Sequence, residues 1–306
     1  MKIYIPKIKE SWVVDRFRKE WITNNQDLHT PFKYNSDILW ILSPWTWNKI
    51  SQKNLKNKKV VCTIHHLESE NIENDIKNFE LLDSFVDAYH IITPKTLEFL
   101  NKSTNKKIIN IPFWVNNEIW KVLENKNDLR KKYKFKESDY LVGSFQRDTE
   151  GKDLKSPKLI KGPDIFINLV SKMYSENKNL KVVLAGRRRQ FVIGELKKRK
   201  IPYTYFEMVD HKVINELYNI LDIYLVTSRI EGGPQAIVEC AVTKTPIMST
   251  DVGIASEILS KESIIRLNNL ESINTNEEFA FEKVKDLILP HGMYKFRDMF
   301  KFVYEN

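Results

Sequence analysis

Short apolar runs rich in β-branched residues alternate with amphipathic stretches along almost the whole chain, and this alternation limits the fold more than any other feature. It is typical of parallel α/β sheets, in which each strand is followed by a helix that covers one face of the sheet. The strands expected in the first half are Lys2–Pro6, Ile38–Ser43, Lys59–Ile64, Ala88–Thr93 and Lys107–Pro112. Those expected in the second half are Tyr140–Phe145, Leu180–Ala185, Tyr203–Phe206, Ile223–Thr227, Pro246–Ser249 and Ser263–Leu267.

The pattern divides into two series of strands and helices that meet near residue 115. The clearest of the expected helices are Trp12–Asn24, Asn71–Phe85, Lys95–Asn101, Pro163–Tyr174 and Val213–Ile220. A length of 306 residues suffices for two domains of ordinary size. We therefore predict an α/β protein with two Rossmann-like domains, residues 1–116 and 117–306, whose parallel sheets face each other across a cleft.

The composition indicates a folded globular protein, with 42% hydrophobic and 29% charged residues. Cys62 and Cys240 lie far apart in apolar runs, which favours reduced thiols and a cytoplasmic location over a disulfide framework. The sequence has neither a signal-peptide pattern nor a run of roughly 18 to 20 apolar residues, so any membrane contact is expected to be peripheral. The net charge of +9 suits an anionic ligand, an anionic membrane surface or nucleic acid equally well.

A glycine-rich segment with two glutamates follows the expected strand Ile223–Thr227. The residues that stand out in it are Glu231, Gly232, Gly233, Pro234, Gln235 and Glu239. The glycines permit a tight turn, and the proline suits the first position of a helix. Backbone amides at such a helix start favour an anion, for which phosphate is the natural candidate. The simpler alternative is a plain turn followed by a glutamate on the protein surface.

A second polar loop follows the expected strand Tyr140–Phe145 and ends in Lys161, Gly162 and Pro163. A lysine beside the amides of a helix start suits a diphosphate group. Arg147 is the expected second cation, with Lys152 and Lys158 as rivals, and a solvated basic loop is the alternative. The sequence contains no Asp-x-Asp, which argues against a metal-bridged diphosphate and leaves the charge to cationic side chains and amides.

Two further groups lie at expected strand ends. His65 and His66 follow Lys59–Ile64, where a ligand would be met, and His65 fits a functional position better; a structural histidine is the alternative. A zinc site is not expected, because adjacent histidines cannot easily share one metal and neither cysteine has ligand spacing. Arg187–Arg189 follow Leu180–Ala185 and are candidates for contact with phosphate or an anionic acceptor.

Several of these motifs together resemble a known enzyme family. Two glutamates separated by seven residues, in the setting Ser-Arg-x-Glu-Gly-x-Pro from Ser228, resemble the retaining glycosyltransferases of family 4 with the GT-B fold. The likeness continues through the Thr-Pro turn and the Thr-Asp-x-Gly stretch of residues 240–253, and through Leu217-Tyr218 and Asp222 upstream. In the first half, Ile111–Asn116 is similar to the family's linker entry.

The resemblance implies roles for individual residues. Glu231 corresponds to the glutamate beside the donor sugar, and Glu239 to the one that binds the nucleotide ribose. Lys161 matches the family's diphosphate lysine, whereas Arg147 stands later than the family's arginine, in a loop about ten residues longer than usual. His65 corresponds to a histidine near the reacting sugar. The final stretch His291–Tyr304 has helical spacing, and in GT-B enzymes such a helix often packs back on the first domain.

We therefore predict a retaining glycosyltransferase that needs no metal cofactor and moves a sugar from a nucleotide-diphosphate donor to an acceptor hydroxyl. The expected acceptor is a glycan or a lipid-linked sugar. A sugar-nucleotide epimerase or phosphorylase of the same fold is the enzymatic alternative. A non-catalytic nucleic-acid-binding protein is the third hypothesis; it would need basic and aromatic residues clustered on one face, which the sequence does not display, so no nucleic-acid partner is expected.

Overall fold

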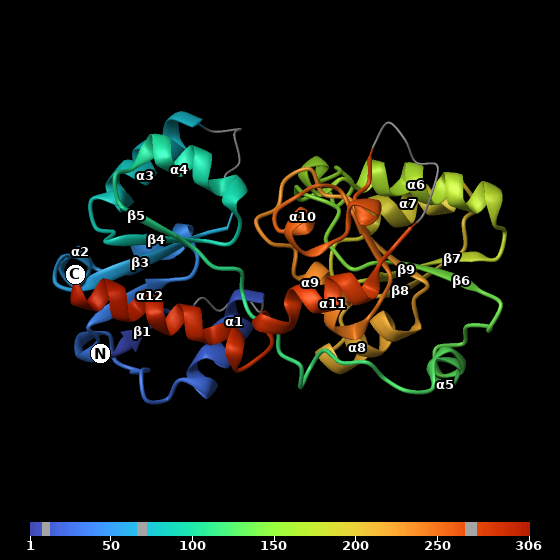
Figure 1. Ribbon diagram of the computed structural model, residues 1–306. Helices are drawn as coiled ribbons and strands as arrows, with labels where there is room; N and C mark the ends of the chain where they lie inside the picture. Colours follow the sequence, from blue (N-terminus) through green and yellow to red (C-terminus); the bar gives the residue numbers. More distant parts are fainter. Residues whose placement is uncertain (8–12, 66–71, 267–273) are drawn as a thin grey trace. The chain divides into compact units, whose positions relative to one another are not determined.

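The computed structural model describes residues 1–7, 13–65, 72–266 and 274–306. The chain forms two compact units. The first unit contains residues 1–114 together with the last stretch, 289–306, and the second contains residues 115–288. Each unit is built on its own five-stranded parallel sheet (Figure 1). The predicted α/β class with two Rossmann-like domains is therefore confirmed, and the cleft between them stays a prediction.

The first sheet has the strand order β1-β2-β3-β4-β5 with every pair parallel. Its strands are β1 (Ile3–Tyr4), β2 (Ile38–Ile41), β3 (Lys59–Ile64), β4 (Ala88–Ile91) and β5 (Lys107–Asn110). The α-helices of this unit are α1 (Val13–Asn24), α2 (Gln52–Lys56), α3 (Ile72–Asp83), α4 (Leu97–Ser103) and α12 (Tyr294–Glu305). Helices α3 and α4 cover one face of the sheet, and α1 and α12 cover the other (Figure 1). Burial of apolar side chains between these layers drives the assembly.

Helix α12 completes the core of the first unit although it is the last element of the chain. Its Phe300 ring lies 5.0 Å from the ring of Trp40 on β2 and 5.2 Å from that of Trp21 on α1. Its Phe296 ring lies 5.0 Å from that of Trp114. All five of these aromatic side chains are buried. Aromatic rings at such spacings stabilise a core beyond the area that they bury.

The second sheet has the strand order β10-β9-β6-β7-β8, again with every pair parallel. Its strands are β6 (Tyr140–Ser144), β7 (Leu180–Ala185), β8 (Tyr203–Phe206), β9 (Ile223–Val226) and β10 (Ile247–Ser249). From β6 the chain first builds the sheet outward through β7 and β8, and then returns to place β9 on the other side of β6. The strand order thus reverses between β6 and β9. In open parallel sheets, ligands bind outside the carboxyl ends of the strands at such a reversal.

Helices cover both faces of the second sheet (Figure 1). The α-helices of this unit are α5 (Lys126–Lys132), α6 (Pro163–Glu176), α7 (Gln190–Lys198), α8 (His211–Ile220), α9 (Gln235–Thr243), α10 (Ala255–Ile258) and α11 (Glu277–Val284). Phe166 and Val170 of α6 pack with Val192 and Leu196 of α7 against the buried side chains of β6 and β7. Their spacings of four residues give each helix the apolar stripe that a sheet-covering helix needs.

Two local predictions are corrected. The expected strand Ser263–Leu267 does not form as far as the structure describes it: residues 261–263 make a 3₁₀ turn, and Ile264 forms one isolated bridge to Ser249. Ile264 and Ile265 are apolar enough for a strand, but the preceding turn leaves too few extended residues for a ladder. Pro234 precedes helix α9 by one position instead of opening it, because the helix begins at Gln235.

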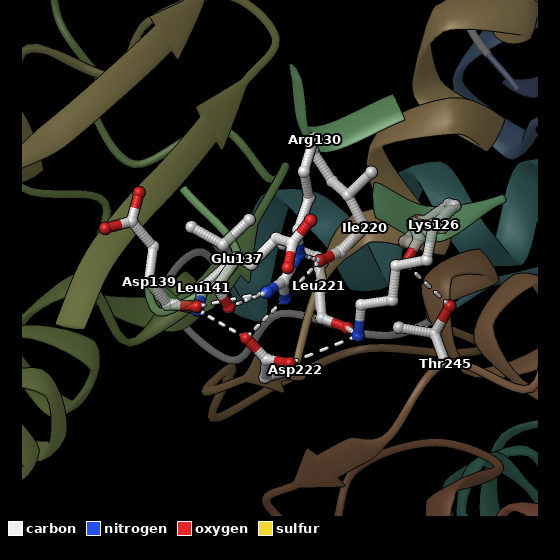
Figure 2. Close-up of polar contacts among 10 residues, drawn as sticks. Lys126, Arg130, Glu137, Asp139, Leu141, Ile220, Leu221, Asp222 and Thr245 are labelled. Carbon is white, nitrogen blue, oxygen red and sulfur yellow. Dashed lines mark hydrogen bonds and ion pairs between the residues drawn. The ribbon is translucent and has the colours of Figure 1, made fainter. Parts of the chain in front are cut away.

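The amino-terminal edge of the second sheet is held by a buried arginine (Figure 2). Arg130 of α5 donates to Asp222 Oδ2 at 2.6 Å and to the carbonyl oxygens of Ile220, Glu137 and Asp139. Lys126 lies on the other side of the same carboxylate, with its Nζ 3.1 Å from Asp222 Oδ1. We call Lys126, Arg130 and Asp222, with these carbonyl groups, the Arg130 cluster. It joins α5, the end of α8 and the starts of β6 and β9.

Both cysteines, Cys62 and Cys240, are free and buried, as predicted. No helix in the described parts of the chain is both long and apolar enough to cross a membrane.

Candidate active site

The carboxyl ends of β6 and β9 bring together two residues that lie 70 positions apart. Lys161, just before helix α6, forms an ion pair with Glu231 of the loop after β9. The two side chains are 21% and 15% exposed, so solvent and ligands can reach both. This places one predicted cation and one predicted carboxylate at the point where the strand order reverses, which is where the fold favours ligand binding.

Gln146 and Ser228 complete the surroundings of this pair. Gln146 Nε2 donates to the carbonyl oxygen of Lys161 at 2.8 Å. Ser228 Oγ lies 3.2 Å from Gln146 Oε1 and 3.1 Å from Glu231 Oε1. We call these four residues the Lys161 cluster. The neutral side chains of Gln146 and Ser228 fix the loops after β6 and β9 relative to each other. The ion pair of Lys161 with Glu231 is the contact that a ligand can replace.

Gly162 allows Lys161 to lie so close to β9. Its φ is +60°, and a Cβ built on it would lie 1.7 Å from the carbonyl oxygen of Thr227. Gly253 after β10 makes a similar approach: a Cβ there would lie 2.3 Å from the carbonyl oxygen of Gly232. Only glycine tolerates such contacts. The loop that carries Gly232 and Gly233 therefore rests against the backbone that follows β10.

Glu239 lies inside α9 and is 7% exposed. Its Oε2 accepts a hydrogen bond from the Tyr218 hydroxyl at 3.0 Å. Burial raises the pKa of Tyr218 and the charge of Glu239 raises it further, which keeps the hydroxyl protonated as a donor. The two glutamates of the motif therefore have different partners: a cation for Glu231 and a neutral phenol for Glu239. The sequence offered no signal for the partnership with Tyr218.

The loop after β6 contains a small hairpin that the sequence did not predict. Thr149 and Pro157 form an antiparallel bridge, Glu150 N donates to the Ser156 carbonyl at 3.0 Å, and Lys158 N donates to the Asp148 carbonyl at 2.8 Å. We call residues 148–158 the β6 hairpin. It accounts for the unusual length of this loop.

The β6 hairpin is fastened to the loop after β7 by a buried ion pair. Asp148 Oδ2 lies 2.9 Å from Arg189 Nε, and the two side chains are 2% and 1% exposed. Burial raises the pKa of Asp148 to about 6, although the charge of Arg189 opposes this change. Arg189, one of the three arginines predicted as phosphate contacts, is therefore enclosed in the protein and holds structure instead. A run of three arginines is typical of a solvated surface, so nothing in the local pattern distinguishes Arg189 from its two neighbours.

Arg147 is tied to the β6 hairpin. Its Nε donates to the carbonyl oxygen of Thr149 at 2.9 Å. Burial lowers the pKa of its guanidinium, and the charge of nearby Arg188 lowers it further. Its predicted contact with the donor diphosphate stays a prediction.

Two histidines lie in the first unit at neighbouring strands. His65 follows β3, as predicted, and its Nε2 lies 2.7 Å from the carbonyl oxygen of Leu42, while its neighbour His66 falls outside the described residues. His90 on β4 is fully enclosed between Thr63 Oγ1 at 2.9 Å and the carbonyl oxygen of Ile111 at 2.7 Å. Burial lowers the pKa of His90 to about 3, so it is a neutral structural residue. His65 is half-buried and keeps its predicted functional role as a prediction.

Within residues 1–7, 13–65, 72–266 and 274–306, no three or more histidine, cysteine, aspartate or glutamate side chains lie close enough together to hold a metal ion.

Comparison with solved structures identifies the architecture. Sucrose-phosphate synthase from Thermosynechococcus elongatus superposes with a TM-score of 0.72 at 13% identity, over 98% of this chain and 81% of that one. Anabaena HepE, in complex with UDP and glucose, gives 0.72 at 10% identity, over 98% and 99% of the two chains. A glycosyltransferase from Rickettsia africae gives 0.69 at 19% identity, over 98% and 84%. At these identities the likeness shows the fold, which is the GT-B fold expected from the sequence motifs.

No curated protein sequence matches this chain. The family model described as glycosyl transferases group 1 matches residues 125–280, which is about half of the chain and includes Arg147, Lys161, Glu231 and Glu239. The chain belongs to the glycosyl transferases group 1 family.

Proposed function

We propose that this glycosyltransferase moves a sugar from a nucleotide-diphosphate donor to an acceptor hydroxyl, with retention at the anomeric carbon. The observation that carries the proposal is the ion pair of Lys161 with Glu231 at the carboxyl ends of β6 and β9. A cation and a carboxylate that neutralise each other in the free protein become available when a ligand separates them. The ammonium group then binds the diphosphate, and the carboxylate accepts hydroxyl groups of the sugar.

The chemical demand of the reaction is the negative charge that grows on the departing diphosphate. Lys161 and the backbone amides near Gln235 at the start of α9 supply positive charge and donors for this group. Glu231 orients the donor sugar and stabilises the positive charge of an oxocarbenium-like centre. Because Gln146 and Ser228 hold both loops, these groups are fixed before the reaction begins.

Glu239 is the proposed ribose ligand. A carboxylate can accept hydrogen bonds from two vicinal hydroxyl groups at once. Tyr218 already donates to one of its oxygens, which fixes the orientation of the carboxylate within α9. His65 of the first unit is proposed to act near the reacting sugar, as its position after β3 suggests. We propose a glycan or a lipid-linked sugar as the acceptor.

Thermal unfolding with a panel of nucleotide sugars tests the donor. UDP-glucose comes first in the panel, because HepE, which shares the fold, was solved with UDP and glucose. A true donor at one hundred times its dissociation constant stabilises the folded protein by about 2.7 kcal/mol. Free glucose at the same concentration is the control. A panel in which no nucleotide sugar raises the melting temperature would contradict the proposal.

The same assay series separates transfer from epimerisation. An epimerase converts its sugar nucleotide without an acceptor, whereas a transferase releases the nucleotide diphosphate in step with acceptor consumption. We further propose that no metal ion takes part, because Lys161 and amide groups are available for the diphosphate charge. Transfer should then continue in excess chelator, and loss of activity that magnesium restores would contradict this part of the proposal.

A further inference from the structure

The strongest unassigned feature of the molecule is a concentration of positive charge around the β6 hairpin. Residues 146–161 and 187–189 carry eight basic and three acidic side chains, against a net charge of +9 for the whole chain. Two of these cations are already committed, Arg189 to Asp148 and Lys161 to Glu231. Arg147 and Arg188 are two further cations of this group that the fold partly encloses.

Arg147 and Arg188 lie close enough together for the charge of one to act on the other. Arg147 donates to the carbonyl oxygen of Thr149, and Arg188 donates through Nη2 to that of Gly151, so both guanidinium groups are attached to the β6 hairpin. The backbone closes the arrangement, because Asp148 N donates to the Arg188 carbonyl at 3.0 Å. Both side chains are half-buried. Within the described residues, neither guanidinium has a carboxylate within 4.0 Å.

Arg188 has two features that are typical of a ligand-binding residue, an unfavourable backbone conformation and a buried donor without an acceptor among the described residues. Its φ is +62°, a left-handed conformation that costs energy for any residue with a Cβ. Its Nε is buried and has no hydrogen-bond acceptor among the described residues. Buried donors are nearly always satisfied in folded proteins, so a donor of this kind calls for an explanation.

We propose that Arg147 and Arg188 form an anion site, separate from the Lys161 cluster, that binds a phosphate group of the acceptor substrate. This inference rests on the proposed function, gives the acceptor its chemical class, and assigns Arg147 to the acceptor phosphate in place of the donor diphosphate that the sequence motifs predict for it. Two guanidinium groups match the two negative charges that a phosphate monoester carries near neutral pH, and their planar forks suit its oxygen atoms. The phosphate belongs either to a soluble sugar phosphate or to the headgroup of a lipid-linked acceptor.

Calorimetric titration with inorganic pyrophosphate tests the site. The titration uses the full chain carrying Lys161→Ala, so that the proposed donor site contributes little to binding. Arg188→Gly is then added to the Lys161→Ala chain. It removes the guanidinium, and glycine suits the left-handed backbone, so the double variant should fold at least as well as Lys161→Ala alone. We expect at least a tenfold loss of pyrophosphate affinity. Lys200→Gly is the matched control, because Lys200 is also basic and has a φ of +55° in the same unit; its affinity should change less than twofold.

Equal pyrophosphate affinity in the two glycine variants would overturn the site. A second measurement guards against confusion with the donor: Arg188→Gly alone should keep the full stabilisation by the nucleotide sugar. Loss of that stabilisation together with pyrophosphate binding would assign the arginines to the donor diphosphate and overturn a separate site. If no nucleotide sugar stabilises the wild-type protein, the proposed function fails, and the pyrophosphate titration still reports on the arginine pair by itself.

Vesicles distinguish the two sources of phosphate. Sedimentation with phosphatidylcholine vesicles that contain phosphatidic acid, abolished by Arg188→Gly and absent with phosphatidylcholine alone, would support a lipid headgroup. Affinity for glucose 1-phosphate that falls at least tenfold in Arg188→Gly, without vesicle binding, would support a soluble sugar phosphate. If the wild-type protein binds neither the vesicles nor glucose 1-phosphate, the assignment to an acceptor phosphate is overturned.

Discussion

The two edges of the second sheet carry polar clusters made from the same kinds of side chain, but the clusters are held differently. In the Arg130 cluster at the amino-terminal edge, the arginine is 4% exposed, and its N–H groups reach Asp222 and three backbone carbonyls. In the Lys161 cluster at the carboxyl-terminal edge, the charged pair is partly open to solvent. A cation whose donors are all bonded to the protein holds structure, whereas one bonded to a single exposed carboxylate can exchange it for a ligand.

Structural and functional charges in this parallel sheet differ in the groups to which they are bonded. Burial alone does not decide, because Glu239 is nearly as buried as Arg130. The kind of partner separates the two cases, because Arg130 is bonded mainly to fixed backbone groups, while Glu231 and Glu239 are bonded to the side chains of Lys161 and Tyr218. The reversal of strand order points to the carboxyl-terminal edge as the place where a ligand binds.

The largest effect is expected from removal of the buried arginine. Arg130→Ala leaves Asp222 and several carbonyl groups without their main partner, and we expect it to lower the free energy of unfolding by about 3 to 5 kcal/mol. Urea unfolding measures the loss. The protein that remains folded should bind its nucleotide sugar as the wild type does. A tenfold change in that affinity would contradict the purely structural role of the Arg130 cluster. Arg199→Ala, at the solvated end of α7, should change stability by less than about 0.5 kcal/mol.

Gly162→Ala is expected to damage the carboxyl-terminal edge through the backbone. The new Cβ would collide with the Thr227 carbonyl, and the residue would keep an unfavourable φ of +60°. We expect a loss of about 2 to 3 kcal/mol in unfolding free energy, together with slower transfer because Lys161 is displaced. Gly194→Ala is the control: that glycine lies inside α7 with open space around it, so alanine should stabilise by about 0.5 to 1 kcal/mol. Unchanged stability in Gly162→Ala would mean that the two loops are not in close contact.

Two lysines in ion pairs on opposite edges give the sharpest comparison. Lys161→Ala should reduce turnover at least tenfold, equivalent to about 1.4 kcal/mol or more, because the diphosphate loses its cation. Lys181→Ala removes the partner of Asp139, 2.8 Å away, at the amino-terminal edge. It should change turnover less than twofold at the same protein concentration. Steady-state rates of nucleotide diphosphate release measure both variants. Equal loss in the two would show that the lysine pairs act only on stability.

The smallest effect is expected for the ribose contact. Glu239→Gln keeps an oxygen that accepts from Tyr218 but removes the charge, so we expect donor affinity to fall about three- to tenfold, or roughly 1 kcal/mol. Glu216→Gln is the matched control, since Glu216 also accepts a hydrogen bond from a tyrosine, Tyr133, but on α8 beside α5. It should leave donor affinity unchanged. A nucleotide-sugar titration followed by thermal shift measures the donor affinity of both variants. An unchanged affinity in Glu239→Gln would show that Glu239 does not belong to the donor site.

Much of the second unit was predictable because its local signals agree with each other. The strand Tyr140–Ser144, the Lys161-Gly162-Pro163 helix start and the two glutamates of the motif each follow from patterns within about ten residues. The ion pair of Lys161 with Glu231 was not predictable from spacing. It depends on the pairing of β9 with β6, and the sequence of a single segment does not determine the order of strands in a sheet.

The failures have a common physical cause, which is that burial of a charged side chain leaves no mark in the local sequence. Asp148 and Arg189 look like members of two solvated basic segments, yet each is enclosed because the other neutralises it. The extra length of the loop before Lys161 was visible, but not that residues 148–158 close it into a hairpin. His90 gave no signal either, since a histidine inside an apolar strand reads the same whether it is structural or functional.

The return of α12 to the first unit sets the order in which the chain can be completed during synthesis. Trp21, Trp40 and Trp114 emerge from the ribosome long before Phe296 and Phe300, the rings that cover them. The second unit, residues 115–288, is made entirely in that interval and can fold first. Until Phe296 and Phe300 of α12 appear, the first unit has an exposed tryptophan-lined face. A nascent chain of this protein is therefore expected to depend on chaperones through its beginning more than through its middle.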